Sequence, residues 1–210
     1  MDSQTKELLL NNARGHVNDV RVSTTAEIQK TTELVERYRQ AGNDIVSQKL
    51  IAHFSERLDE LHHLFPNPYF VRCDVSLVEG ASQILRFGKF AFVEEGIFSW
   101  TSPAATLRFA DIGSVSYESH NGRMWSGTLS RKDQMMISGG KIVFMTSESL
   151  EYERTLVYQE QLSRRKSHFM LPEIVARMER AQDDVIRADY KGLVGTPFFR
   201  HCFSFRPVKI

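Results

Sequence analysis

The hydrophobic pattern of the sequence changes once and abruptly, at Phe65-Pro66-Asn67-Pro68. Residues 1–65 contain no proline, and apolar side chains recur there at helical spacing, as in Leu50, Phe54, Leu58 and Leu61. After the prolines the spacing becomes two, with one side of a predicted strand formed by Val71, Cys73, Val75 and Leu77. The chain is therefore predicted to begin with helices and to continue with strands, an α+β fold.

The helical region, residues 1–65, is predicted to be an antiparallel coiled-coil hairpin, here called the helical arm. We expect a shorter helix over residues 3–15 and a long one over about 24–65, with a soft point at Gly42. Between them, β-branched residues and a Ser/Thr helix-start signal interrupt the pattern. The tip of the hairpin is accordingly predicted at Asn18-Asp19-Val20.

Residues 66–146 are predicted to form a small antiparallel β-rich module with glycine-containing turns. After the first strand, the expected strands are 84–93, 97–101, 114–119, 122–131, 133–138 and 141–146. Helices are expected again over 147–193, at about 148–163 and 172–188, the second opened by Pro172. The tail, residues 194–210, has no assigned structure.

The composition of the chain excludes several classes of protein. Lys and Arg number 27 against 26 Asp and Glu, so a net charge of +1 gives no long-range field for a polyanion or an acidic membrane. Cys73 and Cys202 match no metal-binding or disulfide spacing. Neither a signal-peptide core nor the ~18 consecutive apolar residues of a membrane span occurs. We expect a cytoplasmic protein with free thiols and no membrane contact.

Residues that carry enzymatic chemistry are missing from the sequence. Gly122 and Gly127 have the glycine spacing of a phosphate-binding loop, but Thr128 and Leu129 replace its Lys and Ser/Thr, which favours hairpin turns. The adjacent His62 and His63 point about 100° apart on a helix and are expected to be solvated rather than metal ligands. Taken alone, the residues indicate a binding or interaction module without metal or catalytic groups.

Basic and aromatic residues cluster in the β-rich region, and two interpretations stay open. The clusters are Arg72, Arg86, Lys89 with Phe87, Phe90, Phe92, and Arg123, Arg131, Lys132 near Trp125. Such a mixture on one exposed face could stack single-stranded nucleic acid. Strand alternation instead favours burial of most of the phenylalanines in the core.

A series of short motifs resembles the HelD-type helicases, superfamily 1 motors related to UvrD and Rep that associate with bacterial RNA polymerase. The segment 67–75, NPYFVRCDV, is similar to the family's PYFGRIDF-like segment. In the same order follow Arg86-Phe87-Gly88-Lys89, then 99–104 (SWTSPA) in place of D-W-R-[SA]-P-[IV], and residues 127–142 in place of K-R-Q-x-x-I-x-x-G-x-I. Each motif is short, and their order carries the resemblance.

The segment around Ile174-Val175-Ala176 is similar to the family's adenine-sensing Q motif. The resemblance implies that Gln182 contacts adenine, with Arg187 as a second cofactor-binding candidate. In the family a Walker A loop follows at once, whereas this sequence continues with KGLVGTPFF from Lys191. ATP and Mg²⁺ belong to the complete family, so we expect this chain to hold no cofactor and to hydrolyse no ATP alone.

In the family the arm is an antiparallel coiled coil that enters the secondary channel of RNA polymerase. The resemblance therefore implies a polymerase partner contacted by Asn18, Asp19 and Val20 at the predicted tip, and it also allows contact with nucleic acid. Ser99, Thr101 and Asp133 depart from the family's Asp, Arg and Arg. Two alternatives remain: one chain of a split helicase whose motor is a separate chain, or a non-functional remnant.

Overall fold

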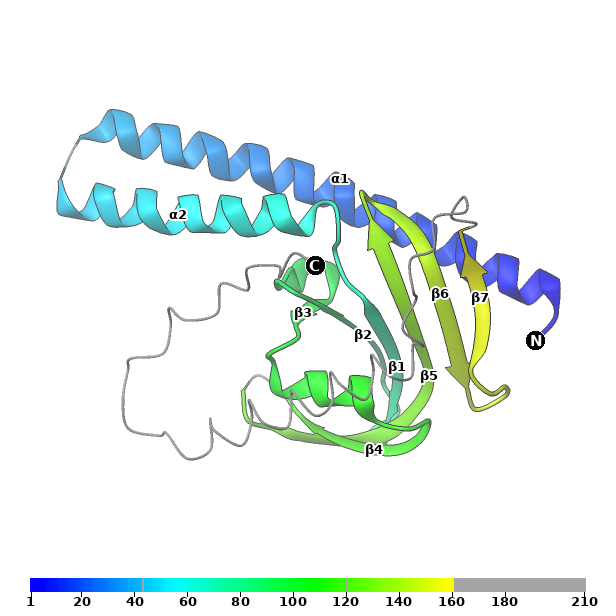
Figure 1. Ribbon diagram of the computed structural model, residues 1–210. Helices are drawn as coiled ribbons and strands as arrows, with labels where there is room; N and C mark the ends of the chain where they lie inside the picture. The colour runs from blue at the N-terminus through cyan, green and yellow to red at the C-terminus, as the bar shows by residue number, and fades with distance from the viewer. Residues whose placement is uncertain (43, 120, 161–210) are drawn as a thin grey trace, which may run out of the picture. The chain divides into compact units, whose positions relative to one another are not determined.

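The computed structural model describes residues 1–42, 44–119 and 121–160. These residues form a mixed α+β structure in which two long helices precede a mixed sheet of seven strands (Figure 1). All the described residues belong to one compact unit. Pro66 therefore marks a change of secondary structure inside one unit. The helix expected at 172–188 and the tail lie outside the described residues.

The two long helices are α1, Ser3–Ala41, and α2, Ile45–Leu64. Each begins at an aspartate: Asp2 accepts a hydrogen bond from the Thr5 amide, and Asp44 accepts from the first turn of α2. The helices run antiparallel beside each other, joined at Gly42, whose φ of 139° suits glycine (Figure 1).

The prediction of a hairpin tip at residues 18–20 is wrong. Asn18, Asp19 and Val20 lie inside the uninterrupted helix α1. Val20 is fully buried, and the Thr24 hydroxyl donates to the Val20 carbonyl, so the β-branched residues continue the helix instead of ending it. Packing thus outweighs their modest helix propensity, and the chain reverses at Gly42.

The sheet has the strand order β3-β2-β1-β5-β6-β7, with β4 also paired to β5. Its strands are β1 Val71–Leu77, β2 Ser82–Gly88, β3 Ile97–Ser99, β4 Gly113–Glu118, β5 Met124–Ser138, β6 Lys141–Ser149 and β7 Thr155–Gln159. All neighbours are antiparallel except β2 and β3, which are parallel. The short 3₁₀ helices η1, Val93–Glu95, and η2, Pro103–Phe109, flank β3.

Two predictions of secondary structure need correction. The strands expected at 122–131 and 133–138 are one strand, β5, which is 15 residues long and bends at register shifts opposite Asp74 and after Met136. The helix expected at 148–163 is wrong over its described part, because β6 continues to Ser149 and 155–159 are strand β7. Thr155-Leu156-Val157-Tyr158 is rich in β-branched and aromatic residues, and β6 offers a free edge for it.

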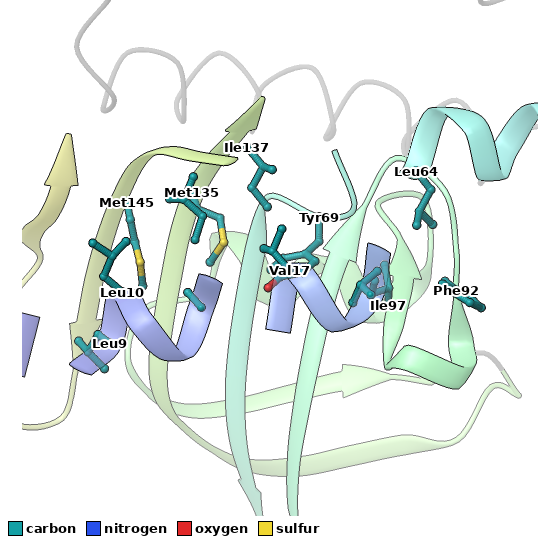
Figure 2. Packing of buried hydrophobic residues seen from close by; sticks show 13 residues of the cluster. Leu9, Leu10, Val17, Leu64, Tyr69, Phe92, Ile97, Met135, Ile137 and Met145 are labelled. Carbon is teal, nitrogen blue, oxygen red and sulfur yellow. The ribbon is translucent and has the colours of Figure 1, made fainter. Parts of the chain in front are cut away.

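Buried apolar side chains form one cluster on each face of the sheet. The first half of α1 packs on one face, where Leu10 and Val17 contact the region of Met135 and Met145 (Figure 2). The opposite face carries the residues that the period of two predicts, namely Val71, Cys73, Val75 and Leu77. There η2 contributes Ala104, Ala105 and Leu107 to the second cluster.

Candidate functional site

Beyond the sheet, α1 and α2 continue side by side to the turn at Gly42 (Figure 1). Near the sheet, Arg57 of α2 still donates to the Ala91 carbonyl at 3.1 Å. We call residues 24–41 and 45–61 the distal helical pair. Its buried side chains are mostly small or polar, namely Thr24, Thr31, Val35, Ser47 and Leu61. The rings of Tyr38 and Phe54 stack at 5.8 Å. At its end, Ile45 and Val46 are 72% and 65% exposed, so the turn presents apolar side chains to solvent.

The carboxylate beside this turn belongs to Asp44 and is already engaged. One oxygen accepts from the amides of Val46 and Ser47 at 2.8 and 3.0 Å, and the other accepts from the Ser47 hydroxyl at 2.8 Å. The backbone hydrogen bond from Ser47, followed by that from its hydroxyl, lowers the pKa of Asp44. Asp44 therefore serves as the start of α2.

The residues that the sequence predicted for partner binding lie elsewhere. Asn18 and Asp19 are exposed in the middle of α1, and Val20 is buried against the sheet. The structure thus separates these three residues from the turn at Gly42. Any contact that they make with a partner would come from the side of α1.

A group of four charged residues, here called the charged quartet, lies on the face of the sheet that α1 covers in part. Strand pairing sets Arg72 opposite Asp133 and Asp74 opposite Arg131. Within each strand the arginine also donates two hydrogen bonds to the carboxylate of the aspartate two residues later. Arg72 donates to Asp74 at 2.7 and 2.9 Å, and Arg131 donates to Asp133 at 2.9 and 2.5 Å. Asp133 is fully buried and also accepts from Ser147 at 2.6 Å.

Next to the quartet, three more polar side chains come from α1, from the segment just before β1, and from β2. His16 and the Tyr69 hydroxyl are 3.1 Å apart, and the Arg86 guanidinium lies 5.8 Å from the centre of the Tyr69 ring. Burial, and then the charges of Arg86 and Arg72, lower the pKa of His16 to about 4, so its imidazole is neutral at pH 7. Burial likewise raises the pKa of Tyr69 to about 12.

Burial decides between the two interpretations of the basic and aromatic clusters at several positions. Phe87 and Phe92 are buried, which confirms the core interpretation for these rings. Lys132 is also buried, and it donates to the Ala110 carbonyl while pairing with Glu148 at 2.7 Å. Arg123 covers the Trp125 ring at 4.0 Å. A flat stacking face built from all these residues is therefore absent within the described region.

The glycines that resemble a phosphate-binding loop have other roles. Gly122 occupies a turn with a positive φ of 79°, as expected. Gly127 lies inside β5, where an added Cβ would come within 2.4 Å of the Ser76 carbonyl oxygen, so the close strand pairing requires glycine. The interpretation of Gly127 as a turn is wrong. His62 and His63 are exposed, and His63 stacks on Phe90.

A small pocket lies between α1, β6 and β7. Its volume is about 200 Å³, and its polar lining comes from Arg14, Lys141, Tyr158 and Glu160. The Arg14 guanidinium covers the Tyr158 ring at 5.0 Å. Across residues 1–42, 44–119 and 121–160, no three His, Cys, Asp or Glu side chains gather as a metal site.

Gln182 and Arg187, the predicted adenine contacts, lie outside the described residues. None of the helices in the described part of the chain has an apolar stretch of the length that crossing a bilayer requires. Comparison with known proteins found no family model that matches this chain and no curated protein that matches it.

Proposed function

We propose that this chain binds bacterial RNA polymerase through the distal helical pair, as the N-terminal region of a HelD-type protein. The proposal comes from the ordered motifs of the sequence, beginning with NPYFVRCDV at 67–75. The 210 residues contain no Walker A motif, so we expect the chain to hydrolyse no ATP by itself.

The observation that best supports the proposal is the exposed apolar end of two long paired helices. At ~1.5 Å per residue, the 39 residues of α1 span about 58 Å. Only its first half is needed to cover the sheet, since the buried α1 residues of the sheet cluster end at Val20. Two helices that extend farther than their own sheet requires, with Ile45 and Val46 exposed at the end, suit insertion into a partner's channel.

The structure changes which residues this proposal assigns to the contact. The turn at Gly42 replaces Asn18-Asp19-Val20 as the leading end. Both oxygens of Asp44 are engaged in starting α2, so contact with a polymerase metal ion is not part of the proposal. The contact that we propose is apolar and centres on Ile45 and Val46.

The experiment is co-elution of the full 210-residue chain with bacterial core RNA polymerase on size exclusion. Val46→Asp places a charge at the turn, near the start of α2, where the helix dipole tolerates an acidic residue. Val22→Asp is the matched control, because Val22 is 64% exposed and Val46 65%. We expect wild type and Val22→Asp to co-elute with polymerase, and Val46→Asp to lose binding.

Two further results would count against the proposal. Loss of binding in Asp19→Ala with retention in Val46→Asp would place the contact on the side of α1 rather than at the turn. A folded, monodisperse wild-type chain that never co-elutes would exclude polymerase binding by this chain alone. Separately, ATP hydrolysis by the purified chain, with or without polymerase, would contradict the expectation of no motor activity.

A further inference from the structure

Arg86 differs from the other arginines of the charged face in its partners. Arg72 and Arg131 each hold an aspartate by two hydrogen bonds. No ion pair joins Arg86 to a carboxylate of the described residues, and its Nε is buried without a hydrogen-bond partner. A buried donor left unpaired costs free energy, and in native structures it calls for an explanation such as a bound ion.

The strand register makes this arrangement more costly. Arg72 and Arg86 stand directly opposite each other on β1 and β2, so two guanidinium groups are neighbours on one face. Like charges in such cross-strand positions destabilise a sheet. The adjacent carboxylates compensate only in part. The charge of Asp74 stabilises the Arg86 guanidinium, but both oxygens of Asp74 and of Asp133 are already held by Arg72 and Arg131.

A count over the strands of this face, which leaves aside the more distant Asp19 of α1, gives an excess of one positive charge. Arg72, Arg86 and Arg131 contribute three, and Asp74 and Asp133 remove two. His16 adds none at pH 7, because burial and the neighbouring arginines lower its pKa to about 4. The excess positive charge is local, since the whole chain has a net charge of only +1.

Arg86 is also held in a fixed position. Its guanidinium packs on the Tyr69 ring, and the Tyr69 hydroxyl is in turn 3.1 Å from His16. The backbone of Gly96 passes close by, since a Cβ there would lie 3.7 Å from an Arg86 terminal nitrogen. Solvent reaches the same side of β2, where Ile84 is 44% exposed. The Arg86 side chain also hydrogen-bonds the Tyr69 side chain, which leaves Nε as its unpartnered donor. A fixed guanidinium of this kind is a group that recognises oxyanions.

We propose that Arg86, with Arg72 beside it, forms a binding site for a phosphate group on the face of the sheet partly covered by α1. The bound oxyanion accepts hydrogen bonds from the Arg86 guanidinium and balances the charge of the two opposed arginines. This site is separate from the turn at Gly42 and does not depend on polymerase binding.

The test is a titration of the full chain with inorganic phosphate at pH 7, with sodium chloride at equal ionic strength as the reference. Proton NMR follows the His16 ring, assigned with His16→Gln. We expect saturable shifts with phosphate only, and an upward movement of the His16 pKa, because an anion offsets the arginines that depress it.

Arg86→Gln removes the proposed ligand-binding group. We expect the phosphate dissociation constant to rise about tenfold or more, as for loss of a charged hydrogen bond. Arg123→Gln is the matched control, because Arg123 pairs with Glu79 at an exposed position away from this face. It is expected to bind phosphate as wild type does. Arg86→Lys, which keeps the charge but not the fork, is expected to bind with intermediate affinity.

AMP and adenosine identify the source of the phosphate group. Tighter binding of AMP than of inorganic phosphate, with none of adenosine, supports a site for a nucleotide phosphate; equal binding supports a site for free phosphate. The proposal is overturned if chloride shifts His16 as phosphate does, or if folded Arg86→Gln binds phosphate with unchanged affinity. The wild-type titration alone decides the question should Arg86→Gln fail to fold.

Discussion

The two halves of α1 bury different surfaces. The first half places Leu9, Leu10, Ala13, Val17 and Val20 in a cluster with the sheet. The second half buries Thr24, Thr31 and Val35 against α2. Apolar burial contributes roughly 25 cal/mol per Å², so the first half is fixed by the shared core and the second by a thinner interface. A single helix can thus be both part of a core and an extension available to a partner.

The largest expected effect tests whether α2 is fixed to the core by its last turn. Leu64 is 1% exposed and belongs to the same cluster as the first half of α1. Leu64→Ala should lower the free energy of unfolding by about 2–5 kcal/mol, through lost burial and a cavity. Urea denaturation measures this value. The control is His62→Ala, at an exposed position, which should change it by less than about 0.5 kcal/mol.

A matched pair of substitutions compares the two halves directly. Val17 and Val35 are 2% and 3% exposed on the same helix. Val17→Ala should cost about 2 kcal/mol of global stability, whereas Val35→Ala should cost about 1 kcal/mol or less and mainly speed hydrogen exchange in the distal helical pair. Equal losses in both, with no local change in exchange, would show that α1 unfolds as one unit.

The pH dependence of stability tests the polar contact between α1 and the sheet. Because the pKa of His16 is lowered from 6.5 to about 4, the unfolded chain binds the proton first. Stability should therefore fall as the pH drops from 7 towards 4, by about 1–2 kcal/mol once solvent screening of this half-buried group is allowed for. Denaturation of wild type and His16→Gln at both pH values measures it; an equally steep loss in His16→Gln would exclude His16 as the source.

The smallest expected effect concerns the start of α2. Asp44→Ala removes the acceptors that hold the amides of Val46 and Ser47. We expect faster hydrogen exchange confined to the first turn of α2, with little change in β5. Asp44→Asn keeps an acceptor and should preserve protection. Because the Asp44 pKa is lowered, protection of this turn in wild type should be present above pH 3.8 and be lost as the pH falls below it.

The sequence predicts the order of elements well where local pattern and packing agree. The helical stretch ending near Leu64 and the inward face of β1 follow from periods of 3.6 and two. Prediction failed where packing decided between two local preferences. Val20 and Val22 looked like a helix end but continue α1, and the residues of β7 looked helical but pair with β6.

The charged quartet could have been found in the sequence from the alternation of side chains along a strand. Arg72-Cys73-Asp74 and Arg131-Lys132-Asp133 repeat one pattern, in which the charges share a face of their strand. The pairing of β1 with β5, which unites the two patterns, joins residues far apart in sequence and is invisible to local reasoning. The contact of His16 with Tyr69 is equally non-local.

α1 and the strands that it packs against are far apart in sequence, so during translation α1 is made well before its partners. Val17 packs in one cluster with Met135 and Met145, which the ribosome adds about 120 residues later. At a translation rate of ~5–20 residues per second, the apolar side of α1 stays exposed for roughly 6–25 s before the strands that bury it are synthesised. During that time a nascent chain displays Leu9, Leu10, Ala13 and Val17 unprotected, and its yield in cells should depend on chaperones that hold such a segment.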